Sequence, residues 1–140
     1  MSLGDMRSDW LDAFADLEIA ICRCASRYCT EPAKRNLAQR LKDLEALDPN
    51  ARLSRDKHAR LGALVAECRQ LMSFRGTLVH SHMRLGSIDN SNVALFRNVA
   101  DETDEVAMTV YQFRKSTENL RRLAGEFERL ARPSPAPEPS

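Results

Sequence analysis

The sequence predicts an all-α fold, an antiparallel four-helix bundle with a short β-hairpin or loop insertion between the third and fourth helices. Glycine is scarce, with 5 in 140 residues, and proline lies only at joints between segments and near the C-terminus. Long stretches carry apolar residues at spacings of three and four, the period of a helix with one buried face. Residues 1–132 are expected to form one domain, and the Pro- and Ser-rich residues 133–140 a disordered tail.

The first two helices are expected over residues 9–29 and 32–47. The first begins with Ser8 or Asp9 as its N-cap. Its apolar stripe comprises Trp10, Phe14, Leu17, Ile21, Ala25 and Tyr28. The second helix ends before a turn at Pro49. Its buried side is expected to comprise Leu37, Leu41, Leu44 and Leu47.

The third helix is expected from Ser54, a good N-cap, to about His80. Its stripe comprises Leu61, Leu64, Val65, Cys68, Leu71, Met72, Arg75, Leu78 and Val79. The runs HMRLGSI and NVALFRNV then lie on either side of the turn-rich segment Asp89–Asn92, which predicts a β-hairpin.

The last helix is expected over residues 102–132, with acidic residues at its start, where the helix dipole favours them. Its apolar residues form a heptad seam, either for packing within the bundle or for a dimeric coiled coil. The seam comprises Val106, Val110, Phe113, Thr117, Leu120, Ala124, Phe127 and Ala131.

Composition argues against several function classes. A net charge of +1 provides no global field toward nucleic acid or membrane, so any such preference must come from a local patch. The N-terminus MSLGDMRSDW lacks the apolar core of a secretion signal, and no apolar run reaches the length of a bilayer span. A cytoplasmic location with no membrane partner is therefore expected. The sequence has no P-loop, dinucleotide-binding glycines or GxSxG motif.

Arg75 falls in the middle of the apolar stripe of the third helix. A buried arginine is costly unless it is paired, so Arg75 requires an acidic partner, a cage of carbonyls, a bound anion or a route to the surface. An ion pair with Asp12 or Glu18 is the explanation that involves no function.

The surroundings of Arg75 favour an anion. No acidic residue lies between Glu67 and Asp89, a window that carries a local basic patch. The patch comprises Arg69, Arg75, His80, His82 and Arg84. Arg69, His82 and Arg84 are candidate RNA-binding residues.

Arg75 and His80 are the candidate catalytic pair. An arginine can stabilise charge on a phosphate, and a histidine can move protons near neutral pH. Together they can promote attack of an RNA 2′-hydroxyl on the adjacent phosphate without a metal or cofactor. In a straight helix, however, five residues rotate by about 140°. The two side chains converge either if the helix distorts near Gly76 or if two copies meet across a two-fold axis.

The motif Arg75-Gly-Thr-Leu-Val-His80, at the end of a third helix, resembles the HEPN superfamily, whose signature is an arginine, four to six residues and a histidine. The resemblance covers the helical layout of residues 9–132, whereas the specific motif is short. It implies a homodimer with facing motifs, and a metal-independent ribonuclease in toxin–antitoxin or phage-defence systems. Arg75 would contact the phosphate and His80 would act as acid/base. The implied partners are RNA, a second copy, and an antitoxin or defence protein.

The sequence departs from the HEPN pattern at two positions. Gly76 stands where a polar residue usually supports the site, and His82 stands where one subgroup has a tyrosine modified by a partner nucleotidyltransferase. A HEPN-like binding or dimerisation module without catalysis is therefore a competing interpretation. A metal site built from His80, His82 and cysteines, and a coiled-coil adaptor using the last helix, are two others.

Overall fold

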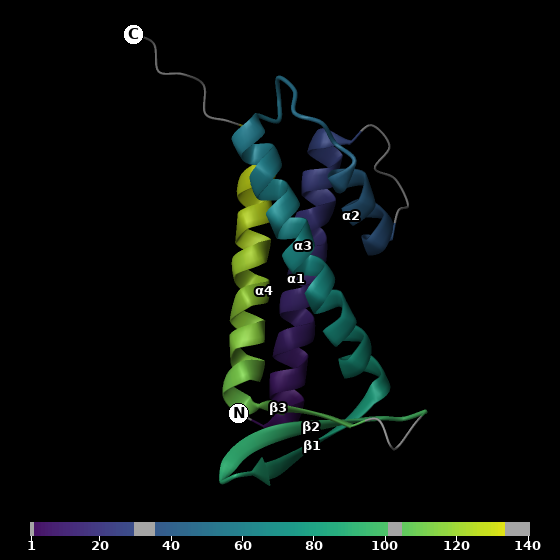
Figure 1. Ribbon diagram of the computed structural model, residues 1–140, viewed down its shortest axis with the longest axis vertical. Helices are drawn as coiled ribbons and strands as arrows, with labels where there is room; N and C mark the ends of the chain where they lie inside the picture. The colour runs from purple at the N-terminus through teal and green to yellow at the C-terminus, as the bar shows by residue number, and fades with distance from the viewer. Residues whose placement is uncertain (1, 30–35, 101–104, 134–140) are drawn as a thin grey trace.

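The computed structural model describes residues 2–29, 36–100 and 105–133. At residue 80 it describes the backbone but not the side chain. The described residues form four helices and a three-stranded antiparallel sheet (Figure 1). The helices are α1 (Leu3–Tyr28), α2 (Leu37–Glu45), α3 (Arg55–His80) and α4 (Val110–Ala131). The strands are β1 (Ser81–Ile88), β2 (Ser91–Asn98) and β3 (Glu105–Thr109). The predicted all-α class is therefore wrong, because a complete small sheet separates α3 from α4. The predicted tail, from residue 134 onward, lies outside the described residues.

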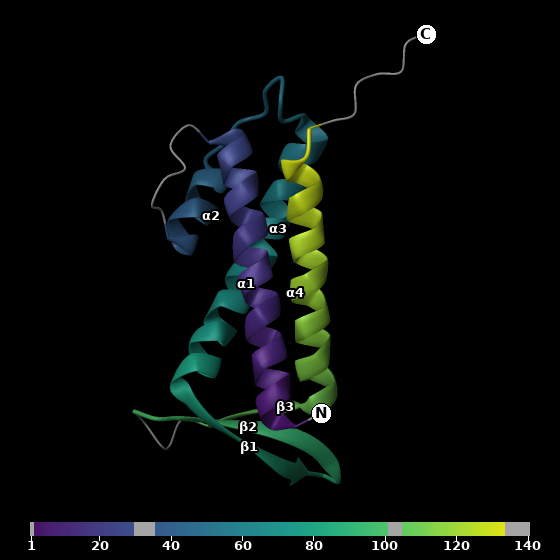
Figure 2. The ribbon, with the colours of Figure 1, turned by 180° about the vertical axis from the view of Figure 1, so that it is seen from behind.

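The helices do not alternate in direction as a simple antiparallel bundle would. α1 and α4 lie side by side and run parallel (Figure 2), because the first half of α1 contacts the first half of α4 and the end of α1 contacts the end of α4. Trp10 Nε1 donates to Ser116 Oγ at 2.9 Å near one end, and Tyr28 Oη donates to the Leu130 carbonyl at 2.6 Å near the other. α3 runs opposite to α4, because Arg60 near its start pairs with Glu126 and Glu67 farther along pairs with Arg122. α3 also runs opposite to α2 (Figure 1). No helix in these described segments is both long enough and apolar enough to cross a bilayer.

The sheet crosses the end of the bundle where α3 ends and α4 begins (Figure 1). The strand order is β1-β2-β3, and β1 pairs with β2 from Ser81↔Asn98 to Ile88↔Ser91. Asp89 and Asn90 form the turn between them, with φ of 50° and 64°. Both lie in the left-handed region that asparagine and aspartate tolerate, as two-residue hairpin turns require. The predicted hairpin segment is thus a strand pair, with a tighter turn than the predicted four residues.

β3 replaces the predicted start of the last helix. Residues 105–109 pair with β2, so cross-strand hydrogen bonding rather than local periodicity decides their conformation. Val106, placed on the heptad seam by the sequence, lies in β3 and is exposed. The helix begins at Val110 because Thr109 and Gln112 form a capping box. The predicted first helical residues, 102–104, lie outside the described segments.

The first helix is longer than its apolar stripe suggests. α1 begins at Leu3 rather than near residue 9, because Ser2 and Asp5 form a capping box. Met6 extends the buried face by one turn before Trp10. The predicted caps Ser8 and Asp9 are therefore inside the helix, where Asp9 forms an ion pair with α4.

Asn36 and Gln39 form the capping box of α2, which begins after the predicted start of the second helix. The predicted residues 32–35 lie outside the described segments. The predicted N-cap of the third helix is confirmed, since the Ser54 side chain accepts a hydrogen bond from the Lys57 amide.

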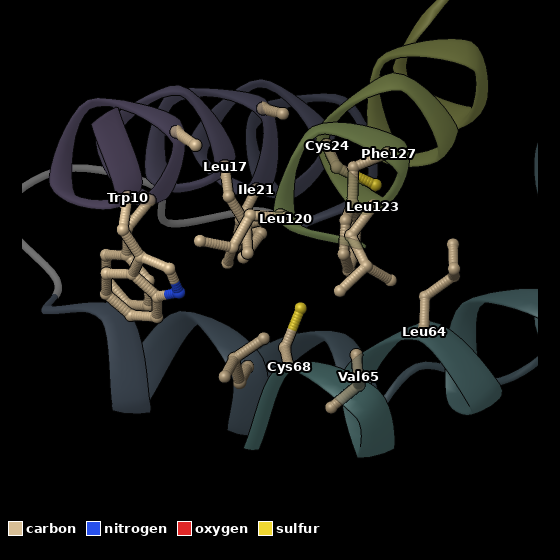
Figure 3. Packing of buried hydrophobic residues seen from close by; sticks show 14 of the residues in the cluster. Trp10, Leu17, Ile21, Cys24, Leu64, Val65, Cys68, Leu120, Leu123 and Phe127 are labelled. Carbon is tan, nitrogen blue, oxygen red and sulfur yellow. The ribbon is translucent and has the colours of Figure 1, made fainter. Parts of the chain in front are cut away.

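An aromatic cluster joins α3 to the other elements. The ring of Phe74 lies with its centroid 5.2 Å from that of Trp10, 5.6 Å from Phe96 and 6.0 Å from Phe113. These rings come from α1, β2 and α4, so Phe74 holds the last part of α3 against both the helices and the sheet. Farther along the bundle, apolar side chains of α1, α3 and α4 interdigitate (Figure 3).

Candidate functional site

Arg75 lies one residue after Phe74, and its guanidinium lies against α1. Its Cζ is 5.3 Å from the centroid of the Phe14 ring, which is almost completely buried, whereas Arg75 itself is exposed. The side chain thus covers an aromatic face and keeps its charge in water. Within the described residues, no carboxylate forms an ion pair with Arg75, so the alternative pairing with Asp12 or Glu18 is not found.

His80 is the last residue of α3, and its side chain lies outside the described part of the structure. The helix ends there because the next residue, Ser81, is extended, with φ −120° and ψ 147°, and begins β1. α3 continues through Gly76 without interruption. The distortion at Gly76 that would let Arg75 and His80 converge within one chain is therefore not observed. A Cβ added at Gly76 would meet no atom within 4 Å, so close packing does not require glycine there.

Arg69 lies on a different side of α3 from Arg75. Six residues rotate a helix by about 240°, which turns Arg69 toward α2. Its Nη2 lies 2.7 Å from Glu45 Oε2 in an ion pair with both side chains partly exposed. Arg69, a predicted RNA contact, is thus separated from the Arg75 site and paired within the fold.

His82 and Arg84 lie together on the face of the sheet turned away from the helices. Alternate residues of a strand share a face, and Met83 between them packs against the core. A third cationic residue, Arg97, joins them because it is the cross-strand partner of His82. These three residues, with Asn98 and Val99, line a concavity of about 280 Å³.

Glu105 holds the two arginines of this face. Arg97 donates from Nε and Nη2 to Glu105 Oε2 at 3.1 and 3.0 Å. Arg84 Nη2 lies 3.7 Å from Glu105 Oε1, so one carboxylate of β3 links cations of β1 and β2. Sequence reasoning missed Arg97 and Glu105. A two-residue turn at Asp89–Asn90 would have identified Arg97, because that register pairs residue 97 with residue 82.

The thiols of the two buried cysteines, Cys24 and Cys68, are expected to be unreactive. Burial raises the pKa of both Cys24 and Cys68 to about 12, with smaller contributions from Cys29 and Glu67 respectively. Both thiols therefore stay protonated at neutral pH and pack as small apolar groups, as Figure 3 shows. Among the described residues, no three His, Cys, Asp or Glu side chains gather as metal ligands would.

Comparison with protein-family models, with curated proteins and with solved structures gives no match. The resemblance to HEPN domains therefore rests on the motif from Arg75 to His80 and on its position at the end of α3.

Proposed function

We propose that this protein is a HEPN-like, metal-independent endoribonuclease that acts as a homodimer with a composite Arg75/His80 site, in a toxin–antitoxin or phage-defence role. The observation that carries the proposal is the state of Arg75. Arg75 is an exposed residue, its guanidinium lies over the Phe14 ring, and it has no carboxylate partner among the described residues. An arginine in this state is ready to bind a phosphate.

The continuous helix supports a site shared between two chains. Over the five residues from Arg75 to His80, a regular helix turns by about 140° and advances by about 7.5 Å. Positions 75 and 80 of one regular helix therefore lie on different sides of the helix axis. A two-fold axis beside the end of α3 would bring Arg75 of one protomer to His80 of its partner, and would do so twice.

The proposed chemistry is transfer of the RNA phosphate to the neighbouring 2′-oxygen. The imidazole of His80 accepts the proton of the 2′-hydroxyl, and the O2′–P bond forms as the P–O5′ bond breaks. Arg75 stabilises the negative charge that builds on the phosphate oxygens. The leaving 5′-oxygen takes a proton from water, and His80 returns its proton to the solvent. The products are a 2′,3′-cyclic phosphate and a 5′-hydroxyl.

A second function has one specific observation in its favour. At Gly76 an added Cβ would meet no atom within 4 Å, yet the polar residue typical of HEPN domains is missing. A HEPN-like module that dimerises or binds a partner, such as a nucleotidyltransferase, without cutting RNA fits that absence.

The decisive assay is cleavage of a mixed labelled RNA by the purified protein in EDTA. Wild type is compared with Arg75→Ala, His80→Ala and, as a matched control, Arg55→Ala. Arg55 is an exposed arginine in the first turn of α3, at the opposite end of that helix. The ribonuclease proposal expects cyclic phosphate ends from wild type and control, and none from the two motif variants. Equal behaviour of all four proteins on RNA would favour the binding module.

A further inference from the structure

The outer face of the sheet carries a cationic surface distinct from the Arg75 site. It is formed by His82 and Arg84 on β1 and Arg97 on β2, and we call it the sheet cation cluster. The opposite face, with Met83 and Phe96, packs against the helices and leaves the cluster in solvent.

Among the described residues, the arginines of the cluster outnumber the carboxylates that contact them. Glu105 is its one described acidic contact, and a single carboxylate balances only one of the two arginines. The side chains are about half exposed, at 55% for Arg84 and 46% for Arg97, and a guanidinium has five N–H donors, more than the contacts with Glu105 use.

The shape and lining of the site fit a phosphate. The concavity of about 280 Å³ is several times the roughly 30 Å³ that one water molecule occupies, so a phosphate group and its waters fit. Guanidinium forks match phosphate oxygens, and the Asn98 amide and the His82 ring add further polar groups. Among the described residues, no phenylalanine, tyrosine or tryptophan lines the concavity, so the groups it offers are mainly those that contact phosphate.

We propose that the sheet cation cluster binds the phosphate backbone of a single-stranded nucleic acid, independently of base sequence. This inference rests on the proposed function in that the bound strand is the RNA to be cut. β1 continues directly from α3, so His82 follows His80 by two residues. The cluster would hold the strand on one side of the cleaved bond, while Arg75 holds the reacting phosphate.

A DNA probe separates binding from cleavage. A fluorescent single-stranded DNA of about 16 nucleotides has the same backbone charge but no 2′-hydroxyl, so it cannot undergo the proposed reaction. Its affinity is measured by anisotropy for wild type, Arg97→Gln, Arg84→Gln and the control Arg55→Gln, with each fold checked by circular dichroism. Arg84→Gln is included because Arg84 has only the longer contact with Glu105, so its loss perturbs the sheet least.

The inference expects about a tenfold weaker binding for Arg97→Gln and a measurable loss for Arg84→Gln, because each removes a charge-assisted contact. The slope of log affinity against log salt should also fall by about 0.7 for each lost contact. The control should bind like wild type. No binding by wild type, or equal losses in the control and the cluster variants, would overturn the inference.

The two proposals fail in different ways. If wild type binds the DNA through Arg84 and Arg97 but cuts no RNA, the binding site stands and the ribonuclease falls. If RNA is cut in a manner dependent on Arg75 and His80, while cluster variants bind like wild type, the ribonuclease stands and the binding site falls.

Discussion

The guanidinium carbon of Arg75 lies 5.3 Å from the centre of the Phe14 ring, so an aromatic side chain of α1 determines where a cation of α3 sits. Phe74, the preceding residue, is fixed by three other aromatic rings. Phe74 and Arg75 are neighbours on α3 but have different roles. Phe74 secures the helix, and Arg75 presents a charge at the surface.

This division of tasks predicts different costs of substitution. Arg75→Met keeps an apolar stem over Phe14 and should lower the free energy of unfolding by about 1 kcal/mol or less, the size of an exposed cation–π contact. Phe74→Ala removes the central ring and should cost about 3 kcal/mol. Urea denaturation of both variants measures the difference. A decrease in the free energy of unfolding as large for Arg75→Met as for Phe74→Ala would show that Arg75 is mainly structural.

Gly76 provides a test of the competing module. Gly76→Ala should raise the free energy of unfolding by up to about 1 kcal/mol, because glycine is a poor helix former and the added methyl group meets no atom. Gly76→Asn introduces a polar side chain of the kind typical of HEPN domains, and should raise the rate of RNA cleavage above that of Gly76→Ala. The measurement compares the initial cleavage rates of the two variants on the same RNA. Equal rates for the two variants would show that a polar side chain at this position does not support the site.

Glu105 should oppose nucleic-acid binding. Glu105→Gln keeps an oxygen that accepts from Arg97 but removes the charge that competes with a phosphate, so single-stranded DNA should bind more tightly. Anisotropy titrations at low and high salt measure this, with the gain largest at low salt. Weaker binding by this variant would indicate that Glu105 orients the arginines more than it competes for them.

The buried thiols predict a loss of stability in alkali. Burial holds the pKa of Cys24 and Cys68 at about 12 in the folded protein, against about 9.0 when unfolded. Between these values the unfolded chain has lost protons that the folded protein keeps, so the free energy of unfolding falls as pH rises above 9. Urea denaturation across this pH range should show that the free energy of unfolding decreases less with rising pH for Cys24→Ala than for wild type. Parallel pH profiles would contradict the assigned pKa.

Much of the helical framework was accessible from sequence. Ser54 was identified as the cap of α3, and the stripes of α1, α2 and α4 match buried positions such as Trp10, Leu41 and Phe127. Helix caps and 3.6-residue periodicity are local signals, so they can be read without knowing the rest of the fold.

β3 could not be predicted in this way because its conformation depends on a partner strand. Val106 continues the spacing of the α4 seam, and the strand has no clean alternation of buried and exposed residues. The capping box of Thr109 and Gln112 was the one local signal that the helix begins at Val110. It marks where α4 starts but does not reveal that a strand precedes it.

The predicted basic patch divides between separate surfaces. Arg69 turns toward Glu45 of α2, Arg75 toward Phe14 of α1, and Arg84 lies on the sheet. Nearness in sequence did not imply nearness in space, because a helix rotates its residues and a strand alternates them.

Subunit complementation tests the composite site most directly. Arg75→Ala and His80→Ala chains carrying different tags are co-expressed, and the mixed dimer is isolated through both tags. In a site shared across a two-fold axis, one of two sites keeps an intact arginine from one chain and an intact histidine from the other, so about half of the wild-type cleavage should return. Each homodimeric variant should be silent. A silent mixed dimer beside an active wild type would place both residues of a site in one chain and contradict the composite arrangement.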